Sequence, residues 1–124
     1  MIGFLATTSA DGTPHIAPVC PIPACGALYL SAGDGTPKIR DLDQRRRYVL
    51  HAFLGEGDEE FQITGDATRI DDPDERARVQ AAITFQYGVE DPILRLDIER
   101  CLWAHWVKPG QPGTYPVKRR WPET

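Results

Sequence analysis

Residues 28–42 combine an apolar segment, hydroxyl side chains and a cation in an order that suits an anion. The apolar residues 28–30 predict a strand, and Ser31 stands at its end. Thr36 and Pro37 have the types preferred at an N-cap and at the first position of a helix, and Lys38 follows them. The start of a helix presents free N–H groups and the positive end of the helix dipole, so a phosphate is stabilised there. These residues alone predict equally well a capped helix with a solvated lysine.

The composition is that of one globular domain. The chain has 124 residues, of which 41% are hydrophobic and 26% are charged. No apolar segment reaches the roughly 18 residues needed to span a membrane. The first residues lack the basic flank of a signal peptide, and three cysteines are too few for a disulfide scaffold. We therefore expect a cytoplasmic protein with reduced thiols and no membrane association.

The charge is unevenly distributed along the chain. The formal net charge is -4, which argues against a nucleic-acid-binding protein. Residues 38–47 contain five basic and two acidic side chains, whereas residues 56–75 contain nine acidic side chains and one basic one. A small anionic ligand would prefer the first segment, although both segments are also typical of solvated surfaces.

The pattern of apolar residues predicts a mainly β fold with two short helices. Strands are predicted at residues 3–8, 14–22, 27–31, 48–54, 60–70, 93–98 and 101–107, with turns at 9–12, 23–26 and 55–58. The helices are predicted at 37–46 and 73–84, and Asp72, Pro73 and Glu75 form a capping signature for the second. Gly65 indicates a bulge or bend within its strand. An antiparallel sheet of six or seven strands, closed as a small Greek-key barrel, fits this order best.

The expected barrel domain covers residues 1–107. Residues 108–124 are rich in proline and glycine and predict an irregular C-terminal tail, which wraps a partner subunit or is disordered.

This order of segments resembles the flavin-binding split-barrel family related to pyridoxamine 5'-phosphate oxidase. Members of that family typically have a strand like residues 3–8, a turn like Asp11-Gly12 and a strand like residues 14–19. A strand that ends in a hydroxyl residue follows, and then a Ser/Thr/Arg-x-Lys step. Ser31, Thr36 and Lys38 occupy these places. The resemblance implies that the three residues hold the phosphate of FMN, with Arg40 as a further helper.

The same resemblance implies where the flavin ring and a second subunit would lie. Residues of the second strand would line the edge and face of the isoalloxazine ring, namely His15, Pro18, Val19 and Cys20. The family builds this site across a homodimer interface, so a homodimer is expected. Trp103, Trp106 and the tail beyond Pro109 are candidates to close the site from the second subunit, and both tryptophans also suit ordinary packing.

The chain departs from the family pattern in two places. It ends Val117-Lys-Arg-Arg-Trp121-Pro and has no Arg-x-His-Asp-Arg type motif for a substrate phosphate, so we do not expect the vitamin oxidase reaction. The family usually has a helix ahead of its first strand, whereas Met1 stands almost on that strand here. We therefore expect a flavin pocket that is shallow or empty.

The leading functional hypothesis is an FMN-dependent oxidoreductase that acts on a small molecule. The cofactor would carry the redox chemistry, so no catalytic residue is assigned, and His15 is the one titratable side chain expected near the ring. Three alternatives remain: a deazaflavin cofactor, haem with His51 or His105 as the axial ligand, or a cofactor-free dimer that is not an enzyme. Zinc bound by Cys20, Cys25, Cys101 and His105 is a weaker hypothesis because Cys20 lies within a predicted strand, so no metal site is expected.

Overall fold

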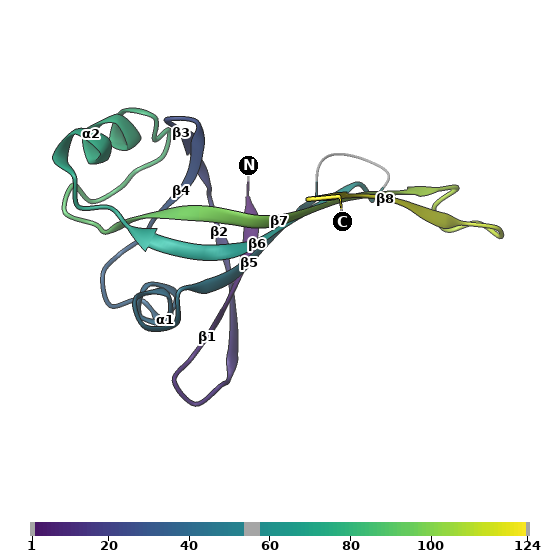
Figure 1. Cartoon of the computed structure of the whole chain (residues 1–124), viewed down its shortest axis with the longest axis horizontal. Helices are drawn as coiled ribbons and strands as arrows, with labels where there is room; N and C mark the ends of the chain where they lie inside the picture. The colour runs from purple at the N-terminus through teal and green to yellow at the C-terminus, as the bar shows by residue number, and fades with distance from the viewer. Residues whose placement is uncertain (1, 54–57, 124) are drawn as a thin grey trace.

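Residues 2–53 and 58–123, which the computed structural model describes, form eight strands and two helices (Figure 1). In chain order these are β1 (Gly3–Thr8), β2 (Pro14–Val19), β3 (Ile22–Ala24), β4 (Ala27–Ser31), α1 (Pro37–Arg45), β5 (Arg47–Phe53), β6 (Glu60–Arg69), α2 (Pro73–Ala81), β7 (Ile93–Val107) and β8 (Tyr115–Trp121). Neither helix in this part of the chain has the length and apolar character needed to cross a membrane.

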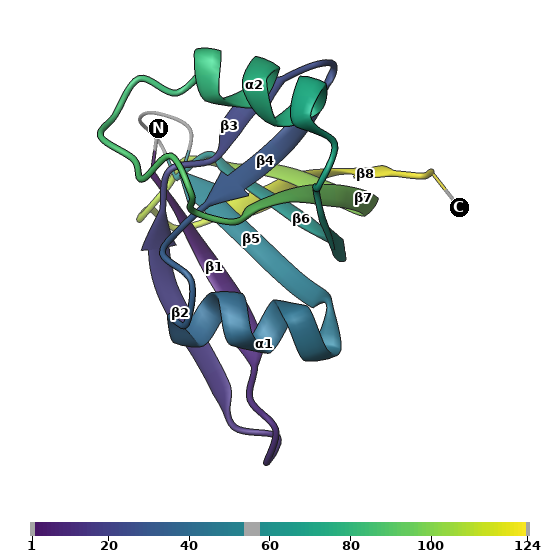
Figure 2. The same ribbon diagram turned by 90° about the vertical axis from the view of Figure 1, so that its left-hand side faces the viewer.

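All strands belong to one curled antiparallel sheet. Its order is β2-β1-β5-β6-β7-β4-β3, and β8 pairs with β7 outside this path. The pairs β1 with β5 and β4 with β7 join strands that are distant in the sequence. Figure 2 shows α1 lying across one end of the curled sheet and α2 near β3 and β4 at the other end. The predicted mainly β split-barrel fold with two helices is confirmed.

Two groups of buried side chains hold the helices against the sheet. Ile39 and Leu42 of α1 are at most 1% exposed and pack with Leu5 and Leu50 inside the curl. Val79 of α2 is fully buried in a second cluster near β3 and β4. Burial of such an aliphatic side chain contributes roughly 1.5–3 kcal/mol, so these contacts fix where each helix lies on the sheet.

A bulge between β6 and β7 gives the sheet its bend, as predicted at Gly65. Thr64 pairs with Arg100 and Gly65 pairs with Ile98, which leaves Glu99 as the extra residue on β7. An added Cβ at Gly65 would lie 1.8 Å from the Asp97 carbonyl oxygen, so the strands can approach here only at a glycine. Bulges increase local twist, which is what a curled sheet needs.

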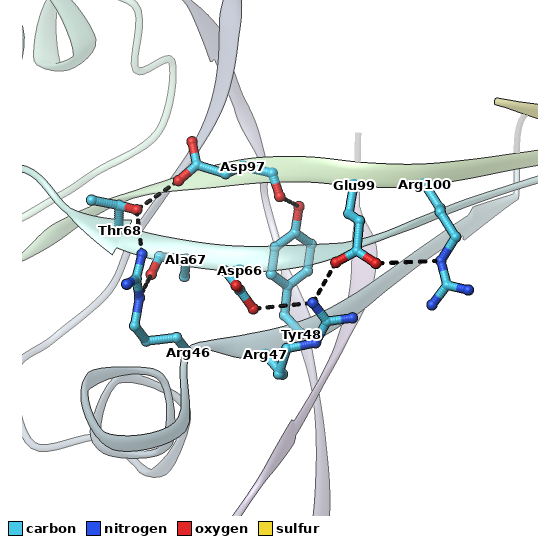
Figure 3. A network of polar contacts seen from close by, with 9 residues as sticks. All are labelled: Arg46, Arg47, Tyr48, Asp66, Ala67, Thr68, Asp97, Glu99 and Arg100. Carbon is cyan, nitrogen blue, oxygen red and sulfur yellow. Dashed lines mark hydrogen bonds and ion pairs between the residues drawn. The ribbon is translucent and has the colours of Figure 1, made fainter. Parts of the chain in front are cut away.

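Polar contacts surround this bulge and connect α1's end with β5, β6 and β7 (Figure 3). The Tyr48 hydroxyl donates to the Asp97 carbonyl oxygen at 3.0 Å. Arg46 donates to the Ala67 carbonyl and to Thr68 Oγ1, and Thr68 in turn donates to the Asp97 carboxylate. Burial raises the pKa of the Tyr48 hydroxyl, so it stays a hydrogen-bond donor at neutral pH.

The structure corrects two predictions about the end of the chain. The predicted strands 93–98 and 101–107 are one continuous strand, β7, because the polar residues between them lie at the bulge, where alternation is interrupted without a break in the strand. The predicted irregular tail is wrong for residues 115–121, which form β8. In Figure 1 the ends of β7 and β8 run together away from the body of the fold.

Smaller corrections concern the first half of the chain. The predicted strand 14–22 is divided into β2 and β3 around Cys20 and Pro21, where proline has no N–H to donate to a ladder. Four strands rather than three therefore precede α1, and the sheet has eight strands rather than six or seven among the described residues.

Asp72 caps α2 as predicted, by accepting from the Glu75 N–H at 2.8 Å, but α2 ends at Ala81. The predicted turn at 55–58 and the strand end at Leu54 lie largely outside the described residues.

Candidate functional site

A small hollow lies between β1, β2 and the start of α1. It has a volume of about 180 Å³ and is lined by Leu5, Thr7, His15, Ile16, Ala17, Pro37 and Lys38. The antiparallel register places Thr7 of β1 directly opposite His15 of β2, so two polar side chains from neighbouring strands meet here. Lys38 makes no ion pair with any described residue, and its charge is therefore available to a ligand in this hollow.

The buried carboxylate of Asp41 lies beside this hollow. It is 4% exposed, and its Oδ2 accepts a hydrogen bond from Thr7 Oγ1 at 2.8 Å. The same oxygen lies 2.8 Å from His15 Nδ1, while Arg45 Nη2 lies 3.6 Å from Oδ1. A carboxylate carries no proton to donate, so His15 Nδ1–H is the donor in this contact.

These contacts keep Asp41 ionised. Burial acts to raise the pKa of Asp41, but the hydrogen bonds from His15 and Thr7 lower it by more, so the pKa lies below its ordinary value. Buried charged residues are rare unless they are paired, and Asp41 meets this condition through side chains from β1, β2 and its own helix. Neither Asp41 nor Thr7 was predicted from the sequence to belong to the site. The one available signal was an aspartate four residues before an arginine on a predicted helix.

The start of α1 has the expected shape but not the expected cap. Thr36 occupies the N-cap position with extended backbone, and Pro37 follows it, yet the Thr36 hydroxyl donates to the Gly33 carbonyl oxygen at 2.9 Å instead of capping the helix. No acidic residue stands in the first turn. No carboxylate within this turn therefore compensates the helix dipole or the free N–H groups.

Ser31 lies at the end of β4, opposite Ile93 of β7. Its Oγ is buried and makes no hydrogen bond to any described residue. An unsatisfied buried hydroxyl costs about 1–3 kcal/mol, so a hydrogen-bond partner for Ser31 Oγ would stabilise the protein. Ser31 and Thr36 do not line the hollow that contains Lys38. Arg40 lines a neighbouring hollow of about 260 Å³, which also includes His15 and Asp41.

The other residues predicted to face a flavin ring have different environments. Pro18 is exposed on β2 and lies opposite Phe4. Val19 is buried in the main core, so only its backbone is available to a ligand. Cys20 is half-buried directly after β2.

Trp103 and Trp106 lie on opposite faces of β7. The Trp103 indole donates to Glu59 at 2.7 Å, and the Arg119 guanidinium of β8 lies 6.0 Å from its ring. Trp106 is 40% exposed. Neither lines the hollow beside Lys38.

The structure does not bring together the side chains of the zinc hypothesis. Among residues 2–53 and 58–123, no three His, Cys, Asp or Glu side chains converge as a metal site would require. His51, one of the two haem candidates, lies 3.2 Å from Glu60, and the ring of the other, His105, lies 4.9 Å from that of Trp103.

The curled antiparallel sheet, with α1 directly after β4, defines a split-barrel protein. The chain belongs to the family described as pyridoxamine 5'-phosphate oxidase, whose sequence profile matches residues 1–104. Comparison with curated proteins gave no match.

Several solved structures share the fold at low sequence identity. A pyridoxamine 5'-phosphate oxidase-related, FMN-binding protein from Nostoc punctiforme is 14% identical, with a TM-score of 0.66, and the match covers 95% of this chain and 86% of that one. An FAD-binding protein from Mycobacterium smegmatis is 17% identical, with a TM-score of 0.66 and coverage of 96% and 84%. A heme-binding protein from the same organism is 20% identical, with a TM-score of 0.66, and the match covers 94% of this chain and 52% of that one.

Proposed function

We propose that this protein binds FMN and functions as a flavin-dependent oxidoreductase on a small-molecule substrate. The observation that carries the proposal is the hollow at the start of α1. Lys38, which has no ion-pair partner within the described part of the chain, and His15 both line it, and the first turn of α1 carries no acidic residue. This is an environment for a phosphate group. The FMN-binding protein from Nostoc punctiforme, which shares the fold, supports the choice of ligand.

The residues present fit the phosphate end of such a cofactor. Lys38 would supply the charge, and the first turn of α1 would supply N–H groups. The Ser31 hydroxyl, which is buried and has no hydrogen-bond partner among the residues described, and the Thr36 hydroxyl, which still has acceptor capacity, would complete the contacts. The flavin supplies redox chemistry when bound, while the chain's own residues bind and orient it.

A second copy of the chain would complete the site. Ligand pockets for molecules of this size usually have about 300–1,000 Å³, so the hollow of about 180 Å³ holds only part of the cofactor. On β1 and β2, the side chains that alternate with the buried Leu5 and Thr7 include Phe4, 42% exposed and opposite Pro18, and Ile16, 73% exposed and opposite Ala6. Ile16, on the edge strand β2, also borders the hollow. Adjacent exposed apolar side chains of this kind mark an interaction surface. We assign this face to a homodimer interface, because Ile16 borders both this face and the hollow, so a partner subunit seated on the face would lie next to the partly formed cofactor site.

Haem is the second candidate, because a heme-binding protein from Mycobacterium smegmatis shares the fold. A deazaflavin would use the same phosphate contacts as FMN. A cofactor-free dimer is the non-enzymatic alternative.

Titration of the purified protein with separate ligands tests the proposal. We expect FMN to bind with quenching of its fluorescence, and we expect riboflavin, which lacks the phosphate, to bind at least tenfold more weakly, because a charged hydrogen bond contributes about 1.5–3 kcal/mol. Haem is titrated in parallel and followed by its absorption. Tight haem binding without FMN binding would support the second candidate, and a folded dimer that binds neither ligand would support the cofactor-free alternative.

A further inference from the structure

The His15 imidazole is held from one side only. Its Nδ1 is bonded to the buried Asp41, while Nε2 makes no hydrogen bond to any described residue. The His15 side chain is 43% exposed, and the residue lines the same hollow as Lys38. A histidine whose one ring nitrogen is bound to a carboxylate has a defined tautomer and ring orientation, and its other nitrogen is free for a ligand.

We propose that Asp41 is a positioning residue, which holds His15 so that Nε2 acts together with Lys38 on the ligand's phosphoryl group, and only when His15 is protonated. This inference rests on the proposed function for the location of the phosphate. Asp41 does not touch the ligand itself. It fixes Nδ1–H toward its own carboxylate, so the proton that His15 gains or loses is the one on Nε2.

The arrangement of charges around His15 favours this role. From α1, Asp41 contacts Nδ1, Arg45 lies against the other oxygen of Asp41, and Arg40 lines a hollow shared with His15. Lys38, also from α1, lines the hollow on the other side. From β1, Thr7 donates to Asp41 and carries no charge. From the turn between β1 and β2, Asp11 lines a further hollow shared with His15. Among the described residues, Asp41 is the one carboxylate within ion-pair distance of His15.

This geometry couples phosphate binding to one proton. Neutral His15 presents a lone pair at Nε2, which repels a phosphate oxygen, whereas the imidazolium presents an N–H donor. A phosphate monoester is a dianion above a pH of about 6, so its own charge changes little at higher pH. A fall in FMN affinity with rising pH, at unchanged riboflavin affinity, would therefore report the loss of the Nε2–H donor of His15.

The first experiment measures the dissociation constants of FMN and riboflavin from pH 6.5 to 8.5. For the wild type we expect FMN affinity to fall about tenfold over this range, as expected for loss of a charged hydrogen bond, and riboflavin affinity to stay constant. His15→Gln should give a constant FMN affinity near the wild-type value at pH 8.5. Asp41→Asn should move the fall in affinity to lower pH. His51→Gln, which alters the second histidine–carboxylate pair of the described chain, should keep the wild-type dependence.

The second experiment needs no flavin. Nitrogen-15 NMR of the histidine side chains, with His15 assigned from His15→Gln, should show the Nδ1–H tautomer of neutral His15 in the wild type and its loss in Asp41→Asn. Inorganic phosphate should shift the Nε2 resonance of His15 and not that of His51. Unfolding midpoints of both variants confirm that they are folded, and the wild-type spectra remain decisive if Asp41→Asn does not fold.

The outcomes separate the two proposals. If FMN binds with no dependence on pH, the positioning role is overturned and the proposed function stands. If FMN does not bind but phosphate shifts Nε2, the proposed function fails and the role of Asp41 and His15 stands. If neither FMN nor phosphate affects Nε2, or if the wild type shows the Nε2–H tautomer, the inference is overturned.

Discussion

Gly65 and Asp97 approach each other so closely that a Cβ on residue 65 would lie 1.8 Å from the Asp97 carbonyl oxygen. This approach occurs at the bulge where Glu99 is the extra residue of β7. The same carbonyl accepts the Tyr48 hydroxyl, so the carbonyl has a side-chain partner where the ladder is irregular (Figure 3). The bulge between β6 and β7 therefore depends on one position that has no side chain.

Gly65→Ala should destabilise the protein by about 3 kcal/mol, at the upper end of the usual cost of overpacking, because the contact involves a backbone atom that cannot rotate away. The free energy of unfolding in urea, measured by circular dichroism, checks this. Gly33→Ala is the control, since its Cβ would meet only Thr36 Cγ2 at 3.7 Å, and its effect should stay within about 1 kcal/mol. A Gly65→Ala protein as stable as the control variant would contradict the described bulge.

Asp41 should make stability depend on acid pH. Its pKa in the folded protein lies below the ordinary value of 3.8, because the donors His15 and Thr7 outweigh burial. A lowered carboxylate pKa contributes stability that is fully present above the unfolded value and is lost as the pH falls through the folded value. Asp41→Asn should therefore lower the free energy of unfolding by about 2 kcal/mol at pH 7 and flatten its decline below pH 4.

Asp43→Asn is the control for this prediction. Asp43 stands on the same helix but is exposed, and it pairs with Arg69 at 3.1 Å. An exposed ion pair contributes at most about 1 kcal/mol, so this variant should change stability less. Urea unfolding between pH 2.5 and 7 measures the free energy of unfolding of both variants. An equal decrease for the two variants would show that the hydrogen bonds to Asp41 stabilise the protein no more than the exposed Asp43–Arg69 ion pair does.

Lys38→Gln tests the phosphate contact. It should weaken FMN binding at least tenfold, because a charged hydrogen bond to phosphate contributes about 1.5–3 kcal/mol, and should leave riboflavin binding unchanged. Fluorescence titration with both flavins measures the two constants. Lys108→Gln, which removes a lysine in the turn between β7 and β8, should bind FMN as the wild type does. An equal loss for FMN and riboflavin would place Lys38 away from the phosphate.

Phe4→Glu tests the proposed dimer interface. A charge in the centre of the apolar face of β1 and β2 should convert a dimer to a monomer, because an unpaired charge cannot be buried without a large cost. Light scattering coupled to size-exclusion chromatography measures the mass. Phe85→Glu is the matched control, because Phe85 is 37% exposed and Phe4 is 42% exposed, and it should leave the dimer intact. A wild-type monomer at micromolar concentration would contradict the interface.

The local signals in the sequence were sufficient for most elements. The cap formed by Asp72, Pro73 and Glu75 predicted where α2 begins, since capping contacts lie within four residues. Gly65 predicted the bulge for a similarly local reason. The unbroken β7 was not predictable in this way. Glu99 and Arg100 interrupt the apolar alternation, and only the partner strand β6 shows that they sit at an extra residue rather than in a turn.

The site was predictable in part. The types and spacing of Ser31, Thr36 and Lys38 predicted an anion site at the start of α1. The structure brings Lys38 and His15 into one hollow there. The spacing did not reveal that the Thr36 hydroxyl turns back to Gly33. The role of β8 as a strand was also missed, because its pairing with β7 provides the backbone partners that its own residues do not signal.

The sequence by itself determined the mainly β class, the start of each helix and the cationic character of the segment around Lys38, because these follow from side-chain type and from neighbours along the chain. Only the tertiary structure decided that Thr7, His15 and Asp41, which are up to 34 residues apart, share one buried carboxylate oxygen. Such a contact depends on how β1, β2 and α1 pack together. Its stability arises from excluding water from Asp41, and no pattern of neighbouring residues records that burial.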